Sequence, residues 1–397
     1  MRICLVTAFP PSHQRINEYG LHLAKAAQAR DEEVVVLGDE YEPRKPELEE
    51  FTVRRCWRFN GLLSPLRILR AVQEIRPDVV WFNLVYSTFG DNPVAAFLGL
   101  CTPLVIRWSG FRTHVTLHHM LEAVELRHAD IRLPGLYKMA GWLATRALLE
   151  ADKVSVLLEH YRKSLIDTYG ATNVNVRRHG ILGDLANPPN FRLRTDEFRV
   201  LVFGKFGRYK RLELVLSAWP KVREAVPNAK LVIAGQDHPN RPGYMAQVAE
   251  QCRHDPSVEF LSYVPEDCLG QVFSSCNAAI LPYSSSGGPS GVAHLAAQYG
   301  LPLIGPAIAD LVHLVSEEGL AIDYYRTEDS ADLAKAIIGL ACDPERAEQM
   351  GEQNYKATFS MTMPQIVGQY LSDFRENQAQ TETAPTSATE LKEKAAA

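Results

Sequence analysis

The sequence predicts an α/β protein of two domains, each a doubly wound parallel sheet covered by helices on both faces. The chain has 397 residues, whereas a single hydrophobic core usually stops growing at about 250–300 residues. Apolar, β-branched runs alternate with amphipathic helical patterns along the chain, which is typical of α/β folds. Most of these runs are continuous rather than alternating, as in strands that are buried on both faces.

The expected strands are short apolar runs separated by turns. In the first half they are Ile3–Thr7, Val34–Leu37, Val79–Phe82, Leu104–Ile106, Val115–Leu117, Val154–Leu157 and Val174–Val176. In the second half they are Val200–Phe203, Leu231–Ala234, Val258–Leu261, Ala278–Leu281, Leu303–Ile304 and Ala321–Ile322. The clearest amphipathic helices are Leu21–Ala29, Leu212–Val222, Met245–Cys252, Ala331–Leu340 and Pro344–Tyr355.

The pattern of strands and helices occurs twice, which sets the expected domain boundaries. The break falls in a Pro- and Asn-bearing stretch, residues 185–199, that is typical of a linker. We therefore expect a first domain at residues 1–185 and a second at residues 198–360. Residues 377–397 are polar and low in complexity, which predicts a disordered tail.

Bulk composition excludes several classes of protein. A content of 46% hydrophobic and 22% charged residues is that of a soluble globular protein, and the net charge of −5 argues against a nucleic-acid partner. The seven cysteines are scattered without a C-x-x-C pair, which favours reduced core thiols in a cytoplasmic protein. We find no signal peptide pattern, and the longest apolar stretch, Val94–Ile106, is too short to cross a bilayer.

Two lysines follow the strand that opens the second domain. The run Val200–Phe203 ends at Gly204, and Lys205 and Lys210 stand five positions apart in the loop behind it. A lysine ammonium is a compact point charge that suits phosphate oxygens, so this loop is a candidate diphosphate site. Two solvated loop lysines are the plainer alternative.

A Ser/Gly loop lies between a later strand of the second domain and a helix of small residues that begins at about Val292. Glycines allow a backbone to approach a ligand closely, and the amides at a helix N-terminus favour an anion or hydroxyl groups. The candidate donor-binding residues of this loop and helix are Ser286, Gly287, Gly288, Ser290, Gly291 and His294.

These pieces, in their order and spacing, resemble the GT-B glycosyltransferases of the large retaining group called family 4. The resemblance is carried by the Pro-Pro loop after the first strand, His179-Gly180, G-K-x-x-x-x-K from Gly204, Leu231–Gly235, the L-P-Y loop with its exit A-A-Q-Y-G-L-P-L-I, and a final helix. It implies two Rossmann-like domains facing across a cleft, with the acceptor on the first domain and a nucleotide-sugar donor on the second. It also implies that the final helix, 364–376, crosses back to the first domain.

The resemblance also implies roles for individual residues. Lys205 and Lys210 match the positions that neutralise the departing diphosphate. His118 matches the family's T-x-H position near the transferred sugar and is the third expected catalytic residue. The family often carries Glu-x7-Glu where this chain has Ser286 and His294. We expect Ser286 to hold sugar hydroxyls and His294 to contact the ribose, although His294 also fits a core histidine.

The acceptor side and the metal content complete the expectations. His13 and Asn17 occupy the loop after the first strand, where the family commonly has a glycine pair, and His119 follows His118. We expect these three residues to face the acceptor. The chain has no Asp-x-Asp motif at a strand end and no zinc-type spacing, so neither a metal ion nor a cofactor besides the donor is expected.

The activity expected from the resemblance is transfer of a sugar from a nucleoside diphosphate sugar to a hydroxyl of a glycan, a glycolipid or other lipid-linked acceptor, or a small-molecule glycoside. Two alternatives stay open: a non-catalytic assembly partner in a polysaccharide pathway, and another GT-B enzyme such as a nucleotide-sugar epimerase. A basic stretch could touch the inner face of an anionic membrane, although we favour an ordinary helix with its arginines in solvent. Its basic residues are Arg54, Arg55, Arg58, Arg67, Arg70 and Arg76.

Overall fold

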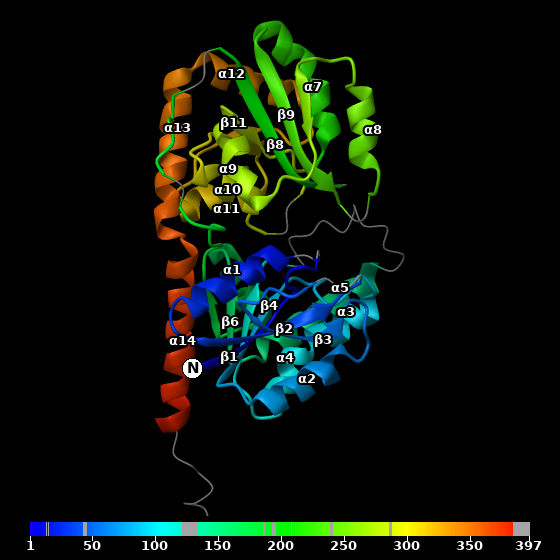
Figure 1. Ribbon diagram of the computed structural model, residues 1–397, viewed down its shortest axis with the longest axis vertical. Helices are drawn as coiled ribbons and strands as arrows, with labels where there is room; N and C mark the ends of the chain where they lie inside the picture. Colours follow the sequence, from blue (N-terminus) through cyan, green and yellow to red (C-terminus); the bar gives the residue numbers. More distant parts are fainter. Residues whose placement is uncertain are drawn as a thin grey trace, which may run out of the picture.

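The computed structural model describes residues 1–12, 14, 16–42, 46–120, 134–185, 187–192, 196–207, 209–238, 241–285 and 288–383. Within these ranges the chain forms two parallel sheets stacked end to end, each with helices on both faces (Figure 1). The first sheet has the order β3-β2-β1-β4-β5-β6-β7, and the second has the order β10-β9-β8-β11-β12-β13. Every strand pair in both sheets is parallel, so the doubly wound α/β prediction is confirmed.

The first sheet and its helices occupy the N-terminal half. The strands are β1 (Arg2–Val6), β2 (Glu33–Glu40), β3 (Thr52–Arg58), β4 (Val79–Leu84), β5 (Thr113–Leu117), β6 (Lys153–Val156) and β7 (Val174–Val176). The helices are α1 (Asn17–Gln28), α2 (Ser64–Ile75), α3 (Pro93–Leu100), α4 (Thr102–Trp108), α5 (Pro134–Leu149) and α6 (Glu159–Tyr169). The central strand β4 is buried at every position, as expected for a strand covered on both faces.

The second sheet begins after the linker. Its strands are β8 (Phe198–Phe206), β9 (Ala229–Asp237), β10 (Val258–Leu261), β11 (Ala278–Ile280), β12 (Leu303–Pro306) and β13 (Ile322–Tyr325). Its helices are α7 (Leu212–Ala225), α8 (Tyr244–Gln251), α9 (Glu266–Ser274), α10 (Gly291–Gln298), α11 (Ala309–Glu318), α12 (Ser330–Cys342) and α13 (Pro344–Ala357). A 3-10 turn, Thr358–Ser360, leads to the last helix, α14 (Met363–Thr383).

Two elements of the first half differ from the prediction. The run Leu104–Ile106 is helical, in α4, and not a strand. A three-residue apolar run fits a buried helix as well as a strand, and Pro103 in the first turn favours the helix. The basic stretch that we expected to be one helix begins as strand β3 and continues as α2 only from Ser64. Arg67 pairs with Glu40 at 2.9 Å, and Arg70 lies in solvent beside Glu74.

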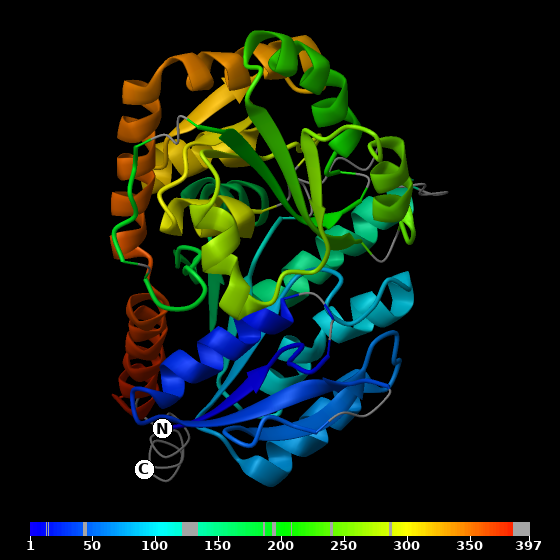
Figure 2. The ribbon, with the colours of Figure 1, turned by 45° about the horizontal axis from the view of Figure 1, so that its top comes forward.

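The last helix, α14, packs on the first domain although it follows the second. It contacts α1, and its ring of Tyr370 lies 4.7 Å from that of Trp81 on β4. Arg177 forms an ion pair with Asp373 of α14 at 2.5 Å. In both views the N-terminus lies beside the lower end of this helix (Figures 1 and 2). The two domains are therefore joined twice, once by the linker and once by the segment before α14.

The two crossings run side by side. The amide of Ile181, just before the linker, donates to the carbonyl of Met361 at 2.8 Å, and Ile181 pairs with Thr362 in a parallel bridge. Met361 itself is completely buried.

Helix α14 continues to Thr383, so the prediction of a disordered tail from residue 377 is wrong for its first seven residues. No proline or glycine occurs between residues 377 and 383, and extending an existing helix by one residue is far easier than starting one. Residues 384–397 of the predicted tail lie outside the described residues. None of the helices within the described ranges combines the length and apolar character needed to cross a bilayer.

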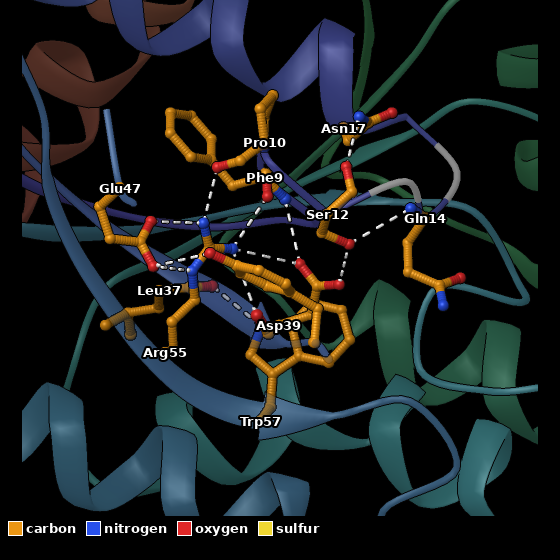
Figure 3. A network of polar contacts seen from close by, with 11 residues as sticks. Phe9, Pro10, Ser12, Gln14, Asn17, Leu37, Asp39, Glu47, Arg55 and Trp57 are labelled. Carbon is orange, nitrogen blue, oxygen red and sulfur yellow. Dashed lines mark hydrogen bonds and ion pairs between the residues drawn. The ribbon is translucent and has the colours of Figure 1, made fainter. Parts of the chain in front are cut away.

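A buried polar network fixes the loop after β1 (Figure 3). Asp39, at the end of β2, accepts hydrogen bonds from the hydroxyl of Ser12 and from the amide of Phe9 at 3.1 Å. Arg55 of β3 donates to the carbonyls of Phe9 at 2.8 Å and Pro10 at 2.6 Å, and it forms ion pairs with Asp39 at 3.5 Å and Glu47 at 2.7 Å. Burial raises the pKa of Asp39, while the hydrogen bonds and Arg55 oppose that rise. The arginine thus holds the described part of this loop, residues 7–12, which forms neither helix nor strand.

Replacing Arg55 tests this anchor. Arg55→Ala leaves the Asp39 carboxylate buried without its cation and frees two loop carbonyls, so we expect a loss of about 3 kcal/mol in the free energy of unfolding. Arg54→Ala is the matched control, because Arg54 pairs with Glu74 in solvent and should contribute less than about 1 kcal/mol. Urea denaturation of the two variants measures both values. Equal losses would contradict the assigned role of Arg55.

Candidate functional site

Two glycines bring a lysine onto the end of β8. Gly204 and Gly235 have φ values of +132° and +140°, which L side chains rarely adopt. A Cβ on Gly235 would collide with the carbonyl oxygen of Gly204, and a Cβ on Gly204 would collide with Nζ of Lys210. The absence of both side chains lets the Lys210 ammonium lie directly over the strand end.

Lys210 is a buried cation at this strand end. Only 6% of the residue is exposed, and Nζ donates a long hydrogen bond of 3.5 Å to the carbonyl of Phe203. Nζ also lies 5.4 Å from the ring centroid of Tyr283. Burial and, after it, the nearby Lys205 ammonium lower the pKa of Lys210 to about 8. Lys205, the second-last residue of the same strand, is half-buried. An anion at this place would relieve both the desolvation and the repulsion.

The N-terminus of α10 lies beside Lys210 and the end of β8. The loops after β8 and β11 are joined by backbone hydrogen bonds, from Arg211 to Pro282 at 2.7 Å and from Ser284 to Tyr209 at 2.9 Å. Ser290 caps α10 by accepting from the amide of Ala293.

The first residues of α10 reach the strand end itself. Val292 lies 3.6 Å from the place where a Cβ of Gly204 would stand. The free amides at the start of this helix therefore face the same region as the lysines, which adds positive potential without another side chain.

Three histidines, His118, His179 and His294, form a histidine column that runs from the first sheet to α10. The ring of His118, directly after β5, lies 4.6 Å from that of Tyr19 on α1. The ring of Tyr19 lies 4.8 Å from that of His179, and His179 stacks on His294 at 4.7 Å. All three imidazoles are more than nine-tenths buried. The column therefore fills the interface between the two domains.

His294 carries a positive charge in this column. Its Nδ1 lies 2.8 Å from the carbonyl oxygen of Ser290, and its Nε2 lies 2.7 Å from Oε2 of Glu318. Both neighbours accept, so both ring nitrogens must donate. Burial alone would lower the pKa of His294, but Glu318 and Ser290 together outweigh burial and raise it. The neighbouring His179 has a pKa far below the ordinary value, because of burial and then the charge on His294.

His118 is neutral and held in one orientation. Its Nε2 lies 2.6 Å from Oδ1 of Asn83, and the amide nitrogen of Asn83 donates to Thr7 at 3.0 Å. Asn83 therefore accepts from His118, which leaves Nδ1 of His118 without a proton. Burial, followed by the nearby His119, lowers the pKa of His118 to about 3. At neutral pH this side chain can accept a hydrogen bond but cannot take up a proton.

Asp310, at the start of α11, ties the Ser/Gly loop to the first domain. It accepts from the amide of Gly288 at 3.0 Å and from the hydroxyl of Tyr161 on α6 at 2.8 Å. A Cβ on Gly288 would stand 2.7 Å from the carbonyl oxygen of His118. The loop of the second domain and the strand end of the first are thus in direct contact.

The structure brings most of the predicted residues to this one interface. Around it lie Gly204, Lys205, Lys210, His118, Gly288, Ser290, Gly291 and His294. His119 is half-buried, with its ring 5.7 Å from that of Tyr86. Asn17 is buried and donates to the carbonyl of Ser12 at 2.7 Å, so its amide holds its own loop. His13, Ser286 and Gly287 lie outside the described residues.

Four residues of the interface escaped the sequence interpretation as site residues: Tyr19, Asn83, Asp310 and Glu318. His179 was noted only as part of the turn before the linker. Asp310 and Glu318 stand at the two ends of α11, where acidic residues are common and carry no motif. Asn83 follows the apolar run of β4, and its place as a polar residue near a strand end is the feature by which the sequence could have indicated a site residue.

The charge on His294 predicts a pH dependence that Glu318→Gln should change. A histidine whose pKa is raised on folding contributes stability below its unfolded value of 6.5, and this contribution is lost as the pH rises through the folded value. In the variant we expect the free energy of unfolding to fall by about 3 kcal/mol near pH 6, because one partner of a buried pair is removed. Above pH 6 the free energy of unfolding should depend less on pH than in the parent chain. Urea unfolding across this range measures both.

The control is Glu348→Gln, which changes an exposed carboxylate on α13. It should keep the pH dependence of the parent chain. A Glu318 variant with that same dependence would contradict a charged His294.

Both halves of the chain match known families. Residues 16–181 match the family model described as glycosyl transferase 4-like domain, and residues 197–343 match the model described as glycosyl transferases group 1. No curated protein sequence matches the chain.

Several solved structures share the fold at low identity. Sucrose-phosphate synthase from Thermosynechococcus elongatus is 18% identical, with a TM-score of 0.77 over 96% of this chain and 100% of that one. HepE of Anabaena, in complex with UDP and glucose, is 16% identical, with a TM-score of 0.70 over 94% and 99%. WaaG, a glycosyltransferase of lipopolysaccharide biosynthesis, is 14% identical, with a TM-score of 0.68 over 93% and 98%. With both halves matched by these family models and the whole chain sharing this fold, the protein belongs to the group 1 glycosyltransferases of GT-B architecture.

Proposed function

We propose that this glycosyltransferase moves a sugar from a nucleoside diphosphate sugar to an acceptor hydroxyl of a glycan, with retention of the anomeric configuration. The observation that carries the proposal is the buried Lys210 ammonium beside Lys205 and the N-terminus of α10. Such a concentration of positive potential fits a diphosphate. The HepE structures, which contain UDP with glucose or UDP-glucose, support a donor of this class.

The lysines and the helix amides would act on the leaving group. As the bond from the sugar to the diphosphate breaks, negative charge grows on the phosphate oxygens. Lys210 is buried and held over the strand end, so with Lys205 beside it this charge would be stabilised with little reorganisation of solvent. A phosphate oxygen of the donor takes the proton of the acceptor hydroxyl on the attacked face, so no carboxylate base is required. With these cations in place, no step of the proposed reaction calls for a metal ion.

His118 would bind a hydroxyl rather than transfer a proton. Its Nδ1 is an acceptor, because Asn83 holds the proton on Nε2, and its pKa of about 3 excludes a general base near neutral pH. We propose that it orients a hydroxyl of the transferred sugar or of the acceptor. The predicted contacts of Ser286, Gly287, His13 and His119 remain part of the same proposal, whereas Asn17, whose amide donates to Ser12, would shape the acceptor loop rather than touch the acceptor.

His294 receives a revised role in this scheme. Both of its nitrogens already bond to Ser290 and Glu318, so a contact with the donor ribose would require one of these bonds to break. We propose that His294 positions the first turn of α10 instead. Residues of α10 that are only half-buried, such as Val292 and Leu295, are better placed to touch a ligand.

Replacing Lys210 tests the proposed chemistry. Lys210→Ala should lower kcat for transfer by about 10²–10³-fold, since one preorganised charge is lost. Lys221→Ala, on the exposed face of α7, should leave kcat unchanged. In the parent enzyme kcat/KM should fall above about pH 8, where Lys210 loses its proton. In Lys210→Arg this fall should begin at a higher pH, because a guanidinium stays charged.

Initial rates with a panel of nucleoside diphosphate sugars, measured as released nucleoside diphosphate with and without acceptors, provide the readout. Full activity in a folded Lys210→Ala protein would contradict the assigned role. Failure of every donor to bind or turn over would favour a non-catalytic assembly partner instead.

We further propose a cytoplasmic enzyme that meets lipid-linked acceptors at an anionic membrane surface. The support is an exposed apolar group at the start of α2, formed by Leu62, Leu63 and Leu66, each more than half exposed. Arg54 pairs with Glu74 and Arg55 is held inside the fold, so the leucines rather than these arginines would make the contact.

Flotation with anionic phospholipid vesicles tests the membrane contact. Leu63→Glu with Leu66→Glu should reduce the vesicle-bound fraction severalfold, because two carboxylates would enter the interface. Ile166→Glu, an exposed apolar position on α6, is the matched control and should bind as the parent does. Equal flotation of both variants, or no binding of the parent, would contradict the proposal.

A further inference from the structure

A cluster of ligand-type side chains spans the two domains. His160 comes from α6 of the first domain, and His313 and Glu317 come from α11 of the second. One nitrogen or oxygen atom from each of the three lies within 4.8 Å of the others. The three side chains are 18–37% exposed, so the cluster can be reached from solvent.

Both histidines of this cluster face one oxygen, Oε1 of Glu317. Nε2 of His160 lies 3.3 Å from Oδ1 of Asp310, so this nitrogen carries the proton. Nδ1 of His160 is then left with a lone pair, is itself buried, and has no hydrogen-bond partner within the described part of the chain. It lies 3.6 Å from Oε1 of Glu317, and Nδ1 of His313 lies 3.3 Å from the same oxygen. Nδ1 of His313 can donate to this oxygen as a neutral imidazole, whereas Nδ1 of His160 still lacks a partner, which a metal ion would supply.

We propose that His160, His313 and Glu317 bind a divalent transition-metal ion of the Zn²⁺ type. Two imidazoles and one carboxylate, with water in the fourth position, form a ligand set that Zn²⁺ commonly accepts. His313 and Glu317 are four residues apart and so project from one face of α11. Asp310 supplies the outer carboxylate that orients a metal-binding histidine.

The rings of His160 and His313 are stacked, with centroids 3.9 Å apart and an interplanar angle of 13°. A metal ion binds in the plane of an imidazole, so binding requires one ring to turn. His313 has the room for this turn, because 37% of its side chain is exposed. His160 is held by Asp310 and stays in place.

A metal ion at this cluster would hold the two domains in the arrangement seen here. Glu317 already accepts from the amides of Glu159 at 2.5 Å and His160 at 3.3 Å, at the start of α6. Asp310, on the same helix, holds the amide of Gly288. The ion would therefore act on the relative position of the domains and on the Ser/Gly loop, and it would take no part in the sugar transfer.

Metal titration of the full chain, after treatment with a chelator, tests the proposal. Co²⁺ should give the visible absorption of a tetrahedral complex at one equivalent, and Zn²⁺ should displace it and raise the Tm, because it binds only the folded state. His313→Gln and His160→Gln should each weaken Zn²⁺ binding more than about tenfold, measured against a chromophoric chelator. His254→Gln, at an exposed histidine elsewhere, is the matched control and should bind as the parent does.

Two outcomes would overturn the proposal. If the parent chain forms no complex at one equivalent, the three side chains do not bind a metal ion, and a proton on Nδ1 of His313 satisfies Glu317 instead. If His313→Gln and His160→Gln bind Zn²⁺ as tightly as the parent, the ion occupies another place. His313→Gln should keep the Tm of the metal-free parent, since the side chain is half-exposed, and this separates lost binding from lost folding.

Discussion

Two parallel sheets can face one another only if the polar groups at their adjoining ends find partners across the gap. In this protein the partners are largely imidazoles and carboxylates, which carry both hydrogen-bonding atoms and an aromatic surface. The pair of His294 and Glu318 is fully buried, so its two charges must neutralise one another, and the neutral His179 stacks directly on that pair. The position of α10 and of the loop before it depends on this arrangement.

The two buried cations near this interface, His294 and Lys210, differ in whether the protein supplies an opposite charge. The charge of His294 is compensated inside the protein, whereas Lys210, among the residues that the structure describes, has a distant carbonyl and aromatic rings around its ammonium. A buried charge that the protein itself does not neutralise raises the free energy of the empty state. A diphosphate would remove this cost by pairing with the ammonium, so the desolvation of Lys210 in the empty protein favours binding of the ligand.

The alternation of strands and helices was readable from the sequence, because continuous apolar runs leave few alternatives to buried parallel strands. Gly204, Lys205 and Lys210 were also readable, since they lie within seven residues of one another. Asp310 and Glu318 were not, because their partners Tyr161 and His294 are far away in sequence and no local pattern marks a contact between domains. The helix at Leu104–Ile106 and the strand β3 were misassigned because these segments are short. A short apolar or basic segment does not show enough of a periodic pattern to distinguish a helix from a strand.

The paired crossings at Ile181 and Met361 limit how the two domains can move. Because both covalent connections pass through one hydrogen-bonded point, translation of one domain past the other would tear that point, whereas rotation about a single axis through it would not. Displacement in such a rotation grows with distance from the axis. His179, in the middle of the histidine column, stands two residues before Ile181 and should therefore barely move. The two sheets should separate most on the side of the molecule opposite α13 and α14 (Figure 1).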